Sequence, residues 1–337
     1  MSPAGAVHVA QWVFPEALAP LAQAGHEVDL RDSDAPAPTP ELTRRVAAAD
    51  ALLCLLTDKV GRDVLAAAPR LRVVANVAAG YDNVDVAAAT ELGVAVTNTP
   101  GVLAEATADL TFALLLACAR KVPAGDAYVR AGRFERWTLA QEQMGADVHG
   151  ACLGILGLGE IGRAVARRAG GGFGMRVLYH SRRRHPEAEA ELGVEWAEWD
   201  DLLGAVDFLS LHAPLTDRTR HVVDAAALAR MKPTAVLLNT ARGPLVDEAA
   251  LAAALAAGRL GGAGLDVYEH EPRVHPDLLA VGDRAVLLPH LGSATETTRR
   301  RMAAMAVAGV LDVLAGRRPQ NLVNPDVLAH PRWKVPA

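Results

Sequence analysis

Residues 151–169 read ACLGILGLGEIGRAVARRA, so a short apolar run is followed by three spaced glycines and then by an alanine-rich run. This order predicts a β-strand, a tight turn and a helix. The glycines would let backbone N–H groups at the start of the helix approach a pyrophosphate and let the helix pack closely on the strand. The stretch therefore predicts a dinucleotide-binding unit, although an ordinary tight turn is the alternative. The predicted cofactor-binding residues of the turn are Gly157, Leu158, Gly159, Glu160, Ile161 and Gly162.

Similar apolar runs, rich in Val and Leu and separated by helical stretches, lie on both sides of this unit. Downstream they are RVLYH, FLSLH, AVLLNT, AGLDV and AVLLPH, and upstream they are AVHVA, HEVDL, ALLCLL, RVVANV and VAVTN. Strands that alternate with helices are typical of parallel sheets covered by helices. The predicted fold class is therefore α/β with two doubly wound parallel-sheet domains, a Rossmann-type nucleotide domain and a flavodoxin-like substrate-binding domain.

The alternation of strands and helices breaks near Pro100. Two helices, at about residues 102–121 and 123–132, follow one another there without a strand. A last helix, at about residues 293–315, comes after the final strand, and we expect it to return to the first domain. The predicted domains are residues 1–100 with 291–337 for substrate binding and residues 101–290 for the dinucleotide.

The composition bounds the class of protein. The chain has 337 residues, of which 51% are hydrophobic, 22% charged and 4% aromatic, as in a globular protein with two cores. A formal net charge of −5 gives no positive field that would attract nucleic acid or an anionic membrane. The most apolar run, LTFALLLACA, is too short to span a bilayer. The three cysteines lack CxxC spacing and the first residues lack a signal-peptide pattern, so we expect reduced thiols, a cytoplasmic location and no metal site.

The second strand of the nucleotide unit ends in a basic turn. An NAD-specific fold usually has Asp or Glu there to bind the ribose hydroxyls, but no acidic residue lies between Phe173 and Pro186. Instead, RVLYH is followed by Ser181, Arg182 and Arg183. Guanidinium groups bind phosphate oxygens through a planar set of donors, so the turn predicts NADP as the cofactor. The alternative is an exposed basic turn beside a site that also accepts NAD.

Three ionisable residues follow strands of the second series. Arg242 comes after AVLLNT, Glu271 after AGLDV, and His290 at the end of AVLLP. Each alone is more often a salt-bridged or surface residue, but doubly wound folds bind ligands at the carboxyl ends of strands. Arg242 could bind the carboxylate of a 2-keto acid and polarise its carbonyl. His290 could donate a proton near neutral pH, with Glu271 favouring its charged form, while a nicotinamide supplies hydride.

Several motifs together carry a resemblance to a known family. They are AAGYDNVDV, VTNTPGVLAEATAD, GILGLGEIGRAVARR, LLNTARGPLVDEAAL, GAGLDVYEHEP and LLPHLGSAT, spread over roughly residues 45 to 325. With them the sequence resembles the D-isomer-specific 2-hydroxyacid dehydrogenases, and FGMRVLYHSRRR and PHLGSATETTR are similar to the glyoxylate/hydroxypyruvate reductase branch. The resemblance implies NAD(P)H-dependent reduction of a small 2-keto acid, glyoxylate or hydroxypyruvate, to the D-2-hydroxy acid.

The resemblance also implies roles for residues at matching positions. The catalytic residues would be Arg242, Glu271 and His290. Backbone amides would bind the substrate carboxylate together with Arg242, and they belong to Ala78, Ala79 and Gly80. The 2′-phosphate contacts would come from Ser181, Arg182 and Arg183. Other positions that would line the cofactor are Thr107, His212, Ala213, Pro214, Thr240, Ala241, Asp266, His290, Gly292 and Ser293.

Two of these roles have structural alternatives. Asp266 would hold the nicotinamide carboxamide, but a helix cap or a buried acid is the other interpretation. Thr107 would line the cofactor, but its hydroxyl could instead bond its own helix backbone. The segment LAQEQM at residues 139–144 departs from the branch, which has an apolar segment there, so the preferred substrate size stays open.

The helices at about 102–121 and 123–132 are more apolar than one packed face requires, which, with the resemblance, predicts a homodimer. Two other functions stay open. One is an NAD-dependent dehydrogenase of a phosphorylated hydroxy acid, similar to phosphoglycerate dehydrogenase. The other is a dinucleotide-sensing corepressor that binds peptide motifs.

Overall fold

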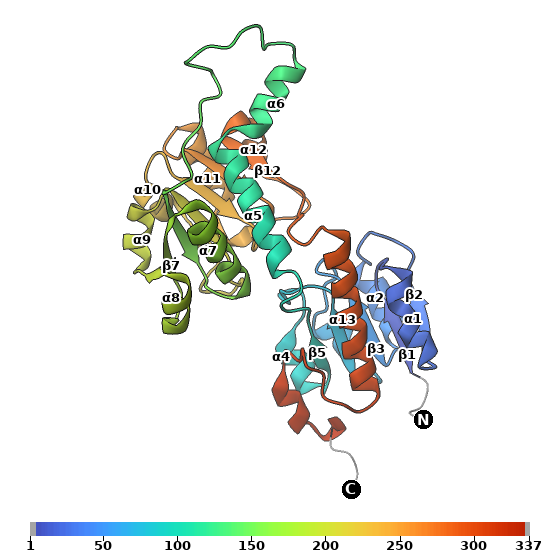
Figure 1. The fold of residues 1–337 in the computed structure, drawn as a ribbon. Helices are drawn as coiled ribbons and strands as arrows, with labels where there is room; N and C mark the ends of the chain where they lie inside the picture. The colour runs from blue at the N-terminus through green and yellow to red at the C-terminus, as the bar shows by residue number, and fades with distance from the viewer. Residues whose placement is uncertain (1–4, 334–337) are drawn as a thin grey trace. The chain divides into compact units, whose positions relative to one another are not determined.

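The computed structural model describes residues 5–333, which form two units (Figure 1). The first unit contains the residues up to Leu103 and those from Thr295 onward, and the second extends from Ala104 to Ala294. The chain therefore leaves the first unit once and returns to it through its last long helix. The limits of the units lie within four residues of the domain boundaries expected from the sequence.

A parallel sheet forms the centre of the first unit, with strand order β2-β1-β3-β4-β5. The strands are β1 (Ala6–Val9), β2 (Glu27–Leu30), β3 (Ala51–Cys54), β4 (Val73–Asn76) and β5 (Ala95–Thr97). The inner strands are short apolar runs because helices cover both of their faces, and every residue of β3, β4 and β5 is buried. This strand order is that of the flavodoxin-like fold, so the prediction for this unit is confirmed.

Helices pack on both faces of this sheet. On one face, α2 (Thr39–Val46), α3 (Arg62–Ala66) and α4 (Val86–Glu91) share a core with alternate residues of the strands. The remaining long helices, α1 (Pro15–Gln23) and α13 (Glu296–Leu314), pack against each other, and α13 lies on β3 and β4. The last described segments are two short 3₁₀ turns, Pro325–Ala329 and Pro331–Trp333.

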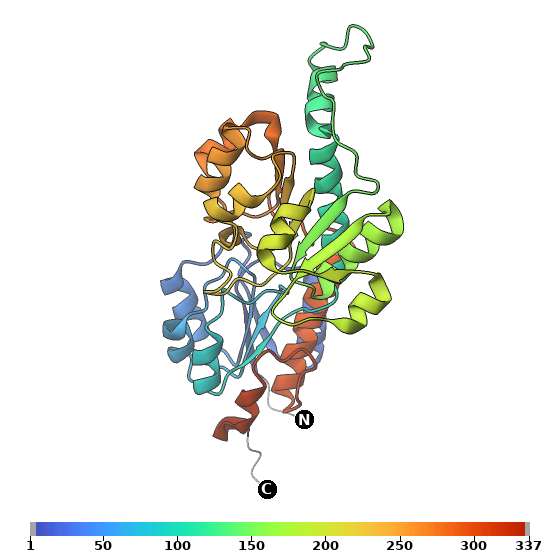
Figure 2. The ribbon, with the colours of Figure 1, turned by 90° about the vertical axis from the view of Figure 1, so that its left-hand side faces the viewer.

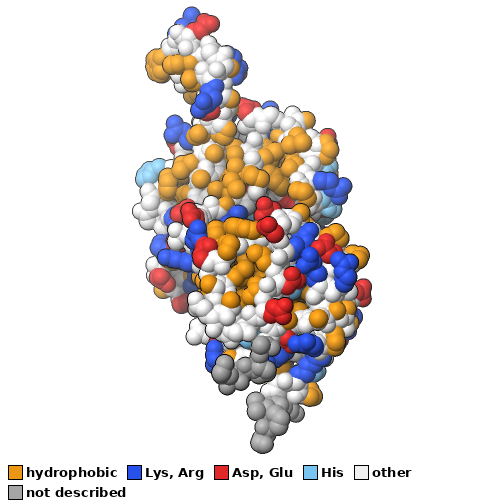
Figure 3. Space-filling view, turned by 90° about the vertical axis from the view of Figure 1, so that its right-hand side faces the viewer, with side chains coloured by type: hydrophobic (Ala, Val, Ile, Leu, Met, Phe, Trp, Pro, Cys, Tyr) orange, Lys and Arg blue, Asp and Glu red, His pale blue; other side chains and the backbone are white. Residues whose placement is uncertain are grey.

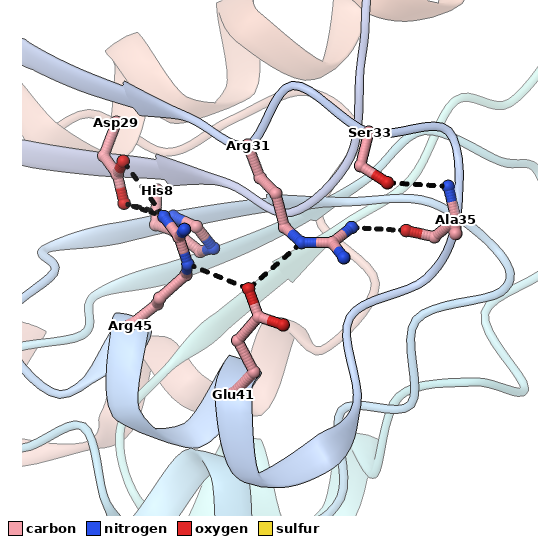
Figure 4. Close-up of polar contacts among 7 residues, drawn as sticks. All are labelled: His8, Asp29, Arg31, Ser33, Ala35, Glu41 and Arg45. Atoms are coloured by element: carbon pink, nitrogen blue, oxygen red, sulfur yellow. Dashed lines mark hydrogen bonds and ion pairs between the residues drawn. The ribbon is translucent and has the colours of Figure 1, made fainter.

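A chain of polar contacts joins α2 to the outer strands of this sheet (Figure 4). His8 Nδ1 lies 2.8 Å from Asp29 Oδ2, and Arg45 Nη1 lies 3.2 Å from the same oxygen. Glu41 accepts hydrogen bonds from Arg45 at 3.2 Å and from Arg31 at 3.1 Å. Burial lowers the pKa of His8, so its ring is neutral at pH 7. The contacts place charged side chains along the edge strand β2, which discourages pairing with another sheet.

A larger parallel sheet forms the centre of the second unit, in the order β12-β11-β10-β9-β6-β7-β8. The strands are β6 (Cys152–Leu156), β7 (Arg176–His180), β8 (Glu195–Trp196), β9 (Phe208–Leu211), β10 (Val236–Asn239), β11 (Gly262–Leu265) and β12 (Ala285–Leu287). Counted within the unit, this is the 3-2-1-4-5-6 order of a Rossmann fold with one further strand. The predicted fold class is therefore confirmed, and the strand order reverses between β6 and β9.

The helices of the second unit follow the expected alternation with strands. They are α5 (Ala104–Ala119), α6 (Val122–Arg130), α7 (Glu160–Phe173), α8 (Pro186–Leu192), α9 (Trp199–Ala205), α10 (Ala225–Arg230), α11 (Glu248–Ala256) and α12 (Pro276–Ala280), with 3₁₀ turns η1 (Gly243–Leu245) and η2 (Gly282–Arg284). The apolar helix α5 packs against α7, β10 and β11. The sequence did not predict β8, because two residues are too few to show a strand pattern.

The segment from α6 to about residue 147 extends away from the rest of the second unit (Figures 1 and 2). None of the residues of α6 is buried. Large hydrophobic side chains are exposed along the segment, namely Val122, Val129, Phe134, Trp137, Leu139 and Met144. Figure 3 shows hydrophobic side chains on this segment and on the neighbouring face of the second unit. A surface of this kind is a candidate site for contact with another protein chain.

Candidate active site

The predicted cofactor and catalytic residues of the second unit gather at one edge of its sheet. Because all of its strands are parallel, their carboxyl ends lie at the same edge. The glycine turn follows β6, Ser181 follows β7, His212 follows β9, Thr240 follows β10, Asp266 follows β11, and His290 comes three residues after β12. This is the edge at which doubly wound folds bind their ligands.

The glycine turn has the geometry that a dinucleotide requires. Gly157 has a positive φ of 93°, and a Cβ atom there would lie 2.8 Å from the backbone nitrogen of Ala213. A Cβ on Gly162 would lie 2.2 Å from the carbonyl oxygen of Gly157, so the helix packs on the turn without room for a side chain. At Gly159, by contrast, a Cβ would meet no atom of the described residues within 4 Å. The second glycine therefore faces open space in which a pyrophosphate fits.

The start of α7 adds to this fit. Gly159 is the residue before the helix, and within residues 5–333 no side chain caps it. The first amides of a helix carry partial positive charge and bind phosphate groups well. Leu158 is buried, whereas Glu160 is exposed. The turn thus presents backbone donors, and Leu158 contributes packing.

His212 lies beside the glycine turn. Its Nε2 atom lies 2.8 Å from Ser210 Oγ, while its buried Nδ1 atom has no hydrogen-bond partner among the described residues. Burial lowers the pKa of His212 to about 3, so the ring is neutral. An unpaired buried nitrogen is unfavourable, and a ligand at this edge would supply a partner for it. The following residues, Ala213 and Pro214, continue the wall of the turn.

The basic turn after β7 leaves two arginines without a carboxylate partner. Ser181 Oγ donates a hydrogen bond to the carbonyl oxygen of Arg183. Arg184 is held by Glu189, with 2.6 Å between Nη2 and Oε2. Arg182 and Arg183 are exposed, and neither forms an ion pair within the described part of the chain. Two guanidinium groups at this strand end are therefore available to an anion.

Glu271 and His290 form a hydrogen-bonded pair, although they are far apart in the sequence. His290 Nδ1 lies 2.8 Å from Glu271 Oε2, and 27% of the histidine side chain and 28% of the glutamate side chain are exposed. The other oxygen of Glu271 accepts the Tyr268 N–H at 3.0 Å. Burial raises the pKa of Glu271, but the hydrogen bond and charge of His290, the Tyr268 N–H and the charge of Arg242 together bring the pKa below its ordinary value. Glu271 is therefore a carboxylate at neutral pH.

Asp266 holds the loop that carries His290. Its carbonyl oxygen accepts the His290 N–H at 2.9 Å. Its carboxylate oxygens accept the N–H groups of Leu291 and Gly292, at 2.7 and 2.8 Å. Burial raises the pKa of Asp266. These bonds hold His290 in a left-handed conformation with φ of 56°, which is uncommon for non-glycine residues.

The hydroxyls of two threonines connect α5 to this edge. Thr107 Oγ1 donates to the carbonyl oxygen of Gly292 at 3.2 Å, rather than to its own helix. Thr111 Oγ1 lies 2.9 Å from Thr240 Oγ1, and both residues are buried. The half-buried Ser293 is adjacent to Gly292. The alternative in which the Thr107 hydroxyl bonds its own helix backbone is therefore wrong, whereas the role of Thr107 toward the cofactor stays a prediction.

Arg242 lies next to the loop of Glu271 because of the glycine that follows it. A Cβ on Gly243 would lie 1.8 Å from the carbonyl carbon of Tyr268, so the two backbone segments touch. Asn239 Nδ2 donates to the carbonyl oxygen of Arg242 at 2.8 Å, and its Oδ1 accepts the Ala241 N–H at 3.1 Å. Sequence reasoning named neither Asn239 nor Gly243, although both belong to the motif LLNTARG.

The remaining predicted residues, Ala78, Ala79 and Gly80, follow β4 in the first unit. Asn98 Nδ2 donates to the carbonyl oxygen of Ala79 at 2.7 Å. Asn76 Nδ2 donates to that of Gly80 at 2.8 Å. Side chains thus hold the carbonyl groups of the loop, and within residues 5–333 its amides have no partner. The two asparagines are further residues that the sequence did not reveal.

Two kinds of site are absent from the described residues. No helix in residues 5–333 is both long and apolar enough to pass through a bilayer. The same residues hold no group of three or more His, Cys, Asp or Glu side chains arranged for a metal ion. The three cysteines are free, with Cys54 buried and Cys118 and Cys152 half-buried.

The chain is similar to known proteins over most of its length. The family model for the NAD-binding domain of D-isomer specific 2-hydroxyacid dehydrogenases matches residues 112–292. A glyoxylate reductase of Aeropyrum pernix is 48% identical over 325 residues, which cover 96% of each chain. A glyoxylate reductase of Thermococcus litoralis is 46% identical over 94% of this chain and 96% of its own.

Solved structures agree with these sequence matches. The crystal structure of an NADPH-dependent glyoxylate/hydroxypyruvate reductase from Sinorhizobium meliloti, in complex with NADP and malonate, is 33% identical with a TM-score of 0.86, over 96% of this chain and 98% of that one. The TT0316 protein of Thermus thermophilus is 45% identical with a TM-score of 0.88, over 94% and 99%.

Proposed function

The chain belongs to the family of D-isomer specific 2-hydroxyacid dehydrogenases, and from this membership we propose that it is an NADPH-preferring reductase of glyoxylate and hydroxypyruvate. It is an oxidoreductase that interconverts a small 2-keto acid and the 2-hydroxy acid with a nicotinamide dinucleotide. One observation carries the catalytic proposal. It is the hydrogen-bonded pair of Glu271 and His290 at the edge of a Rossmann sheet, in which the charge of Arg242 also lowers the pKa of Glu271.

We assign the proton donor of the reduction to His290. Its Nδ1 is engaged by Glu271, so Nε2 is the ring nitrogen that delivers a proton to the carbonyl oxygen. The carboxylate of Glu271 is hydrogen-bonded to Nδ1 and fixes the ring orientation. When bound, the nicotinamide supplies hydride to the carbonyl carbon.

We assign recognition of the substrate carboxylate to Arg242 and to the loop of Ala78, Ala79 and Gly80. A guanidinium can bind a carboxylate with two parallel hydrogen bonds and polarise the adjacent carbonyl. The loop amides are unpaired in the described residues, and a carboxylate is a good acceptor for several N–H groups.

We assign the 2′-phosphate of NADPH to Ser181, Arg182 and Arg183. The absence of an acidic residue at this strand end removes the group that would repel a phosphate. The two unpaired guanidinium groups supply charge, whereas Arg184 is already occupied by Glu189. This contrast between neighbouring arginines supports NADPH as the preferred cofactor, with NADH as a weaker substitute.

We assign Asp266 to the nicotinamide carboxamide, and it also holds the loop that carries His290. Each of its oxygens accepts one backbone N–H and has a further lone pair for an amide donor. The buried Thr107 and the turn from His212 to Pro214 complete the wall of the cofactor site. Asp266 would then connect the cofactor to the loop that carries His290.

Initial rates with two cofactors and three substrates test the proposal. We expect NADPH to give a kcat/KM at least about tenfold above that of NADH, since charge-assisted hydrogen bonds contribute about 1.5–3 kcal/mol each. Glyoxylate and hydroxypyruvate should be reduced faster than phosphohydroxypyruvate. Preference for NADH with the phosphorylated substrate would identify a phosphoglycerate-type dehydrogenase instead. Failure to oxidise either cofactor with any 2-keto acid would leave a dinucleotide-sensing binding protein.

We also propose that the enzyme is a homodimer joined through the segment from α6 to residue 147. The segment exposes several large hydrophobic side chains and contributes nothing to the core of its own unit, since α6 has no buried residue. A second copy of the chain would cover this surface with a matching segment, as a two-fold interface requires. The polar stretch at residues 139–144 lies on the same segment.

A further inference from the structure

A second group of ionisable residues lies next to the loop of Glu271 and has no role in the proposed proton transfer or substrate binding. It consists of His221, Glu248 and Glu269. His221 Nε2 lies 2.6 Å from Glu269 Oε1. Glu248 is 3% exposed, and its Oε1 atom accepts the Glu269 N–H at 2.6 Å. The Glu269 carboxylate in turn lies 3.5 Å from the backbone nitrogen of Glu248.

The two glutamates therefore hold each other's backbone. Glu248 is the first residue of α11, so the Glu269 carboxylate lies at the start of that helix, where negative charge is favourable. The Glu248 carboxyl lies in the interior, where burial raises its pKa, while backbone hydrogen bonds from Glu269 and His275 lower it. A buried carboxyl needs such hydrogen bonds, and through one of them Glu248 holds the Glu269 N–H.

The backbone at Tyr268 and Glu269 is in contact with both catalytic loops. The peptide between these two residues is held by Glu248 through the Glu269 N–H. It packs against the backbone of Gly243, whose Cβ would lie 2.4 Å from the Glu269 nitrogen, and Gly243 follows Arg242 directly. The Tyr268 N–H, which belongs to the preceding peptide, donates to Glu271 at 3.0 Å. Tyr268 therefore connects the peptide beside Arg242 to the Glu271–His290 pair.

His221 anchors the group from a third segment. Its backbone has a left-handed φ of 50°, and its N–H donates to the carbonyl oxygen of Pro244 at 2.8 Å. The chain next to it pairs with the segment after Arg242, because the Val223 N–H donates to Leu245 and the Asp247 N–H donates to Val223. His221 therefore binds Glu269 from a strained and well-fixed position.

We propose that Glu248 is a positioning residue for the reduction, which acts through Glu269 and His221 to fix the Tyr268–Glu269 peptide and so to set Glu271 against Arg242. The proposal rests on the proposed function for its kinetic test. It needs Glu248 only as a hydrogen-bond acceptor, not as a charge. A displacement of the peptide by a fraction of an ångström would move the carboxylate that orients His290, and small misplacements of this kind strongly reduce turnover.

Two substitutions at position 248 and one control separate positioning from packing. Glu248→Ala should lower kcat by about 10- to 100-fold with little change in cofactor affinity, since an active-site displacement of about 1 Å costs up to about 100-fold. Glu248→Gln keeps an acceptor oxygen and should restore kcat to within about threefold of the wild type. The control is Asp247→Ala, which removes the cap on the Ala250 N–H of the same helix but touches neither Tyr268 nor Glu269. It should leave kcat unchanged.

The pH profile gives a second readout that a loss of packing would not move. The Tyr268 N–H is one of the groups that lower the pKa of Glu271. In Glu248→Ala, weakening of this hydrogen bond should shift the acid limb of kcat to higher pH, whereas Asp247→Ala should keep the wild-type limb. If Glu248→Ala fails to fold, His221→Ala tests the same network from its half-exposed end, and the same shift is expected.

Hydrogen exchange of the cofactor-free protein tests the network without any activity. The peptide that spans residues 266–273 should exchange faster in Glu248→Ala and His221→Ala, and at the wild-type rate in Glu248→Gln and Asp247→Ala. A wild type that reduces no 2-keto acid would overturn the proposed function but leave this measurement valid. Equal exchange in all variants, or equal kcat in Glu248→Ala and Asp247→Ala, would overturn the positioning role.

Discussion

The Nδ1 atom of His290 lies 2.8 Å from the Oε2 atom of Glu271, so two residues on different loops share one hydrogen bond. The remaining oxygen of Glu271 accepts the Tyr268 N–H, and the backbone of His290 is held by Asp266. Hydrogen bonds to the backbone therefore fix both Glu271 and His290 in place. This arrangement selects one ring nitrogen of His290 for chemistry and leaves the other committed to the carboxylate.

Replacement of His290 should remove most of the turnover. His290→Ala should lower kcat by about 10²- to 10⁴-fold, the usual contribution of a general acid, and should leave the Kd for NADPH nearly unchanged. Stopped-flow hydride transfer and cofactor fluorescence would measure the two effects. As a matched control, His149→Ala replaces an exposed histidine in the turn before β6 and should keep full activity. Wild-type turnover in His290→Ala would exclude it as the proton donor.

Stability should depend on pH through Glu271. Its pKa lies below the ordinary value in the folded protein, so its pairing contributes fully above the unfolded pKa of about 4.3 and is lost as pH falls through the folded value. The difference in the free energy of unfolding between the wild type and Glu271→Gln should therefore be larger at pH 7 than at pH 3.5. Urea unfolding at the two pH values measures it. A difference that does not change with pH would contradict the assignment of this pKa.

The choice of cofactor should depend on two neighbouring arginines. Replacing Arg182 and Arg183 together by alanine should raise the KM for NADPH by more than about tenfold, because charge-assisted contacts to the 2′-phosphate are lost, and should change the KM for NADH little. Arg184→Ala is the control, since this guanidinium is paired with Glu189. Equal losses for both cofactors would argue against recognition of a 2′-phosphate.

Two glycines of the turn, Gly159 and Gly162, should respond differently to the same added methyl group. Gly162→Ala should lower Tm, because its Cβ would lie 2.2 Å from the carbonyl oxygen of Gly157. Gly159→Ala should keep the wild-type Tm, because its Cβ would enter open space, yet should weaken NADPH binding where the pyrophosphate approaches. Calorimetry with and without NADPH separates these effects. Tight NADPH binding by Gly159→Ala would place the pyrophosphate elsewhere.

The oligomeric state should depend on the segment from α6 to residue 147. Trp137 and Leu139 are 70% and 85% exposed, and replacing both by aspartate should shift the protein from dimer to monomer in light scattering, since charges in an apolar interface are unfavourable. The fold of each unit should persist, as judged by circular dichroism. Leu279→Asp, at an exposed leucine on α12, is the control and should stay dimeric. A wild type that is already monomeric would contradict the proposed dimer.

Much of the fold could be predicted because its signals are local. The Val- and Leu-rich runs of β3, β4 and β10 lie in strands that are buried throughout, and a short apolar run between helices indicates such a strand without reference to the rest of the chain. The glycine turn between β6 and α7 was recognisable for the same reason. Strand β8 was missed because its pairing with β7 depends on a neighbour rather than on its own two residues.

The catalytic candidates could be predicted from the sequence only in part. Strand-end positions placed Arg242, Glu271 and His290 at one edge, but the spacing of the sequence did not show that Glu271 and His290 touch. The sequence did not show the importance of Gly243 either. A glycine is required there because the backbone of Tyr268, twenty-five positions away in the chain, leaves no room for a Cβ atom. The roles of these residues in catalysis stay predictions until the variants are measured.

The amino-acid sequence by itself determined the two parallel sheets, the glycine turn between strand and helix and the residue types available for acid catalysis, because each follows from periodicity or spacing within a short stretch. Tertiary structure alone decided which side chains hold one another. Glu248 and Glu269 exchange hydrogen bonds across twenty-one positions of the chain, and Asp266 anchors residues twenty-five and twenty-six positions beyond it. Such contacts form only when separate strands end at the same edge, so they are properties of the folded sheet and not of any one segment.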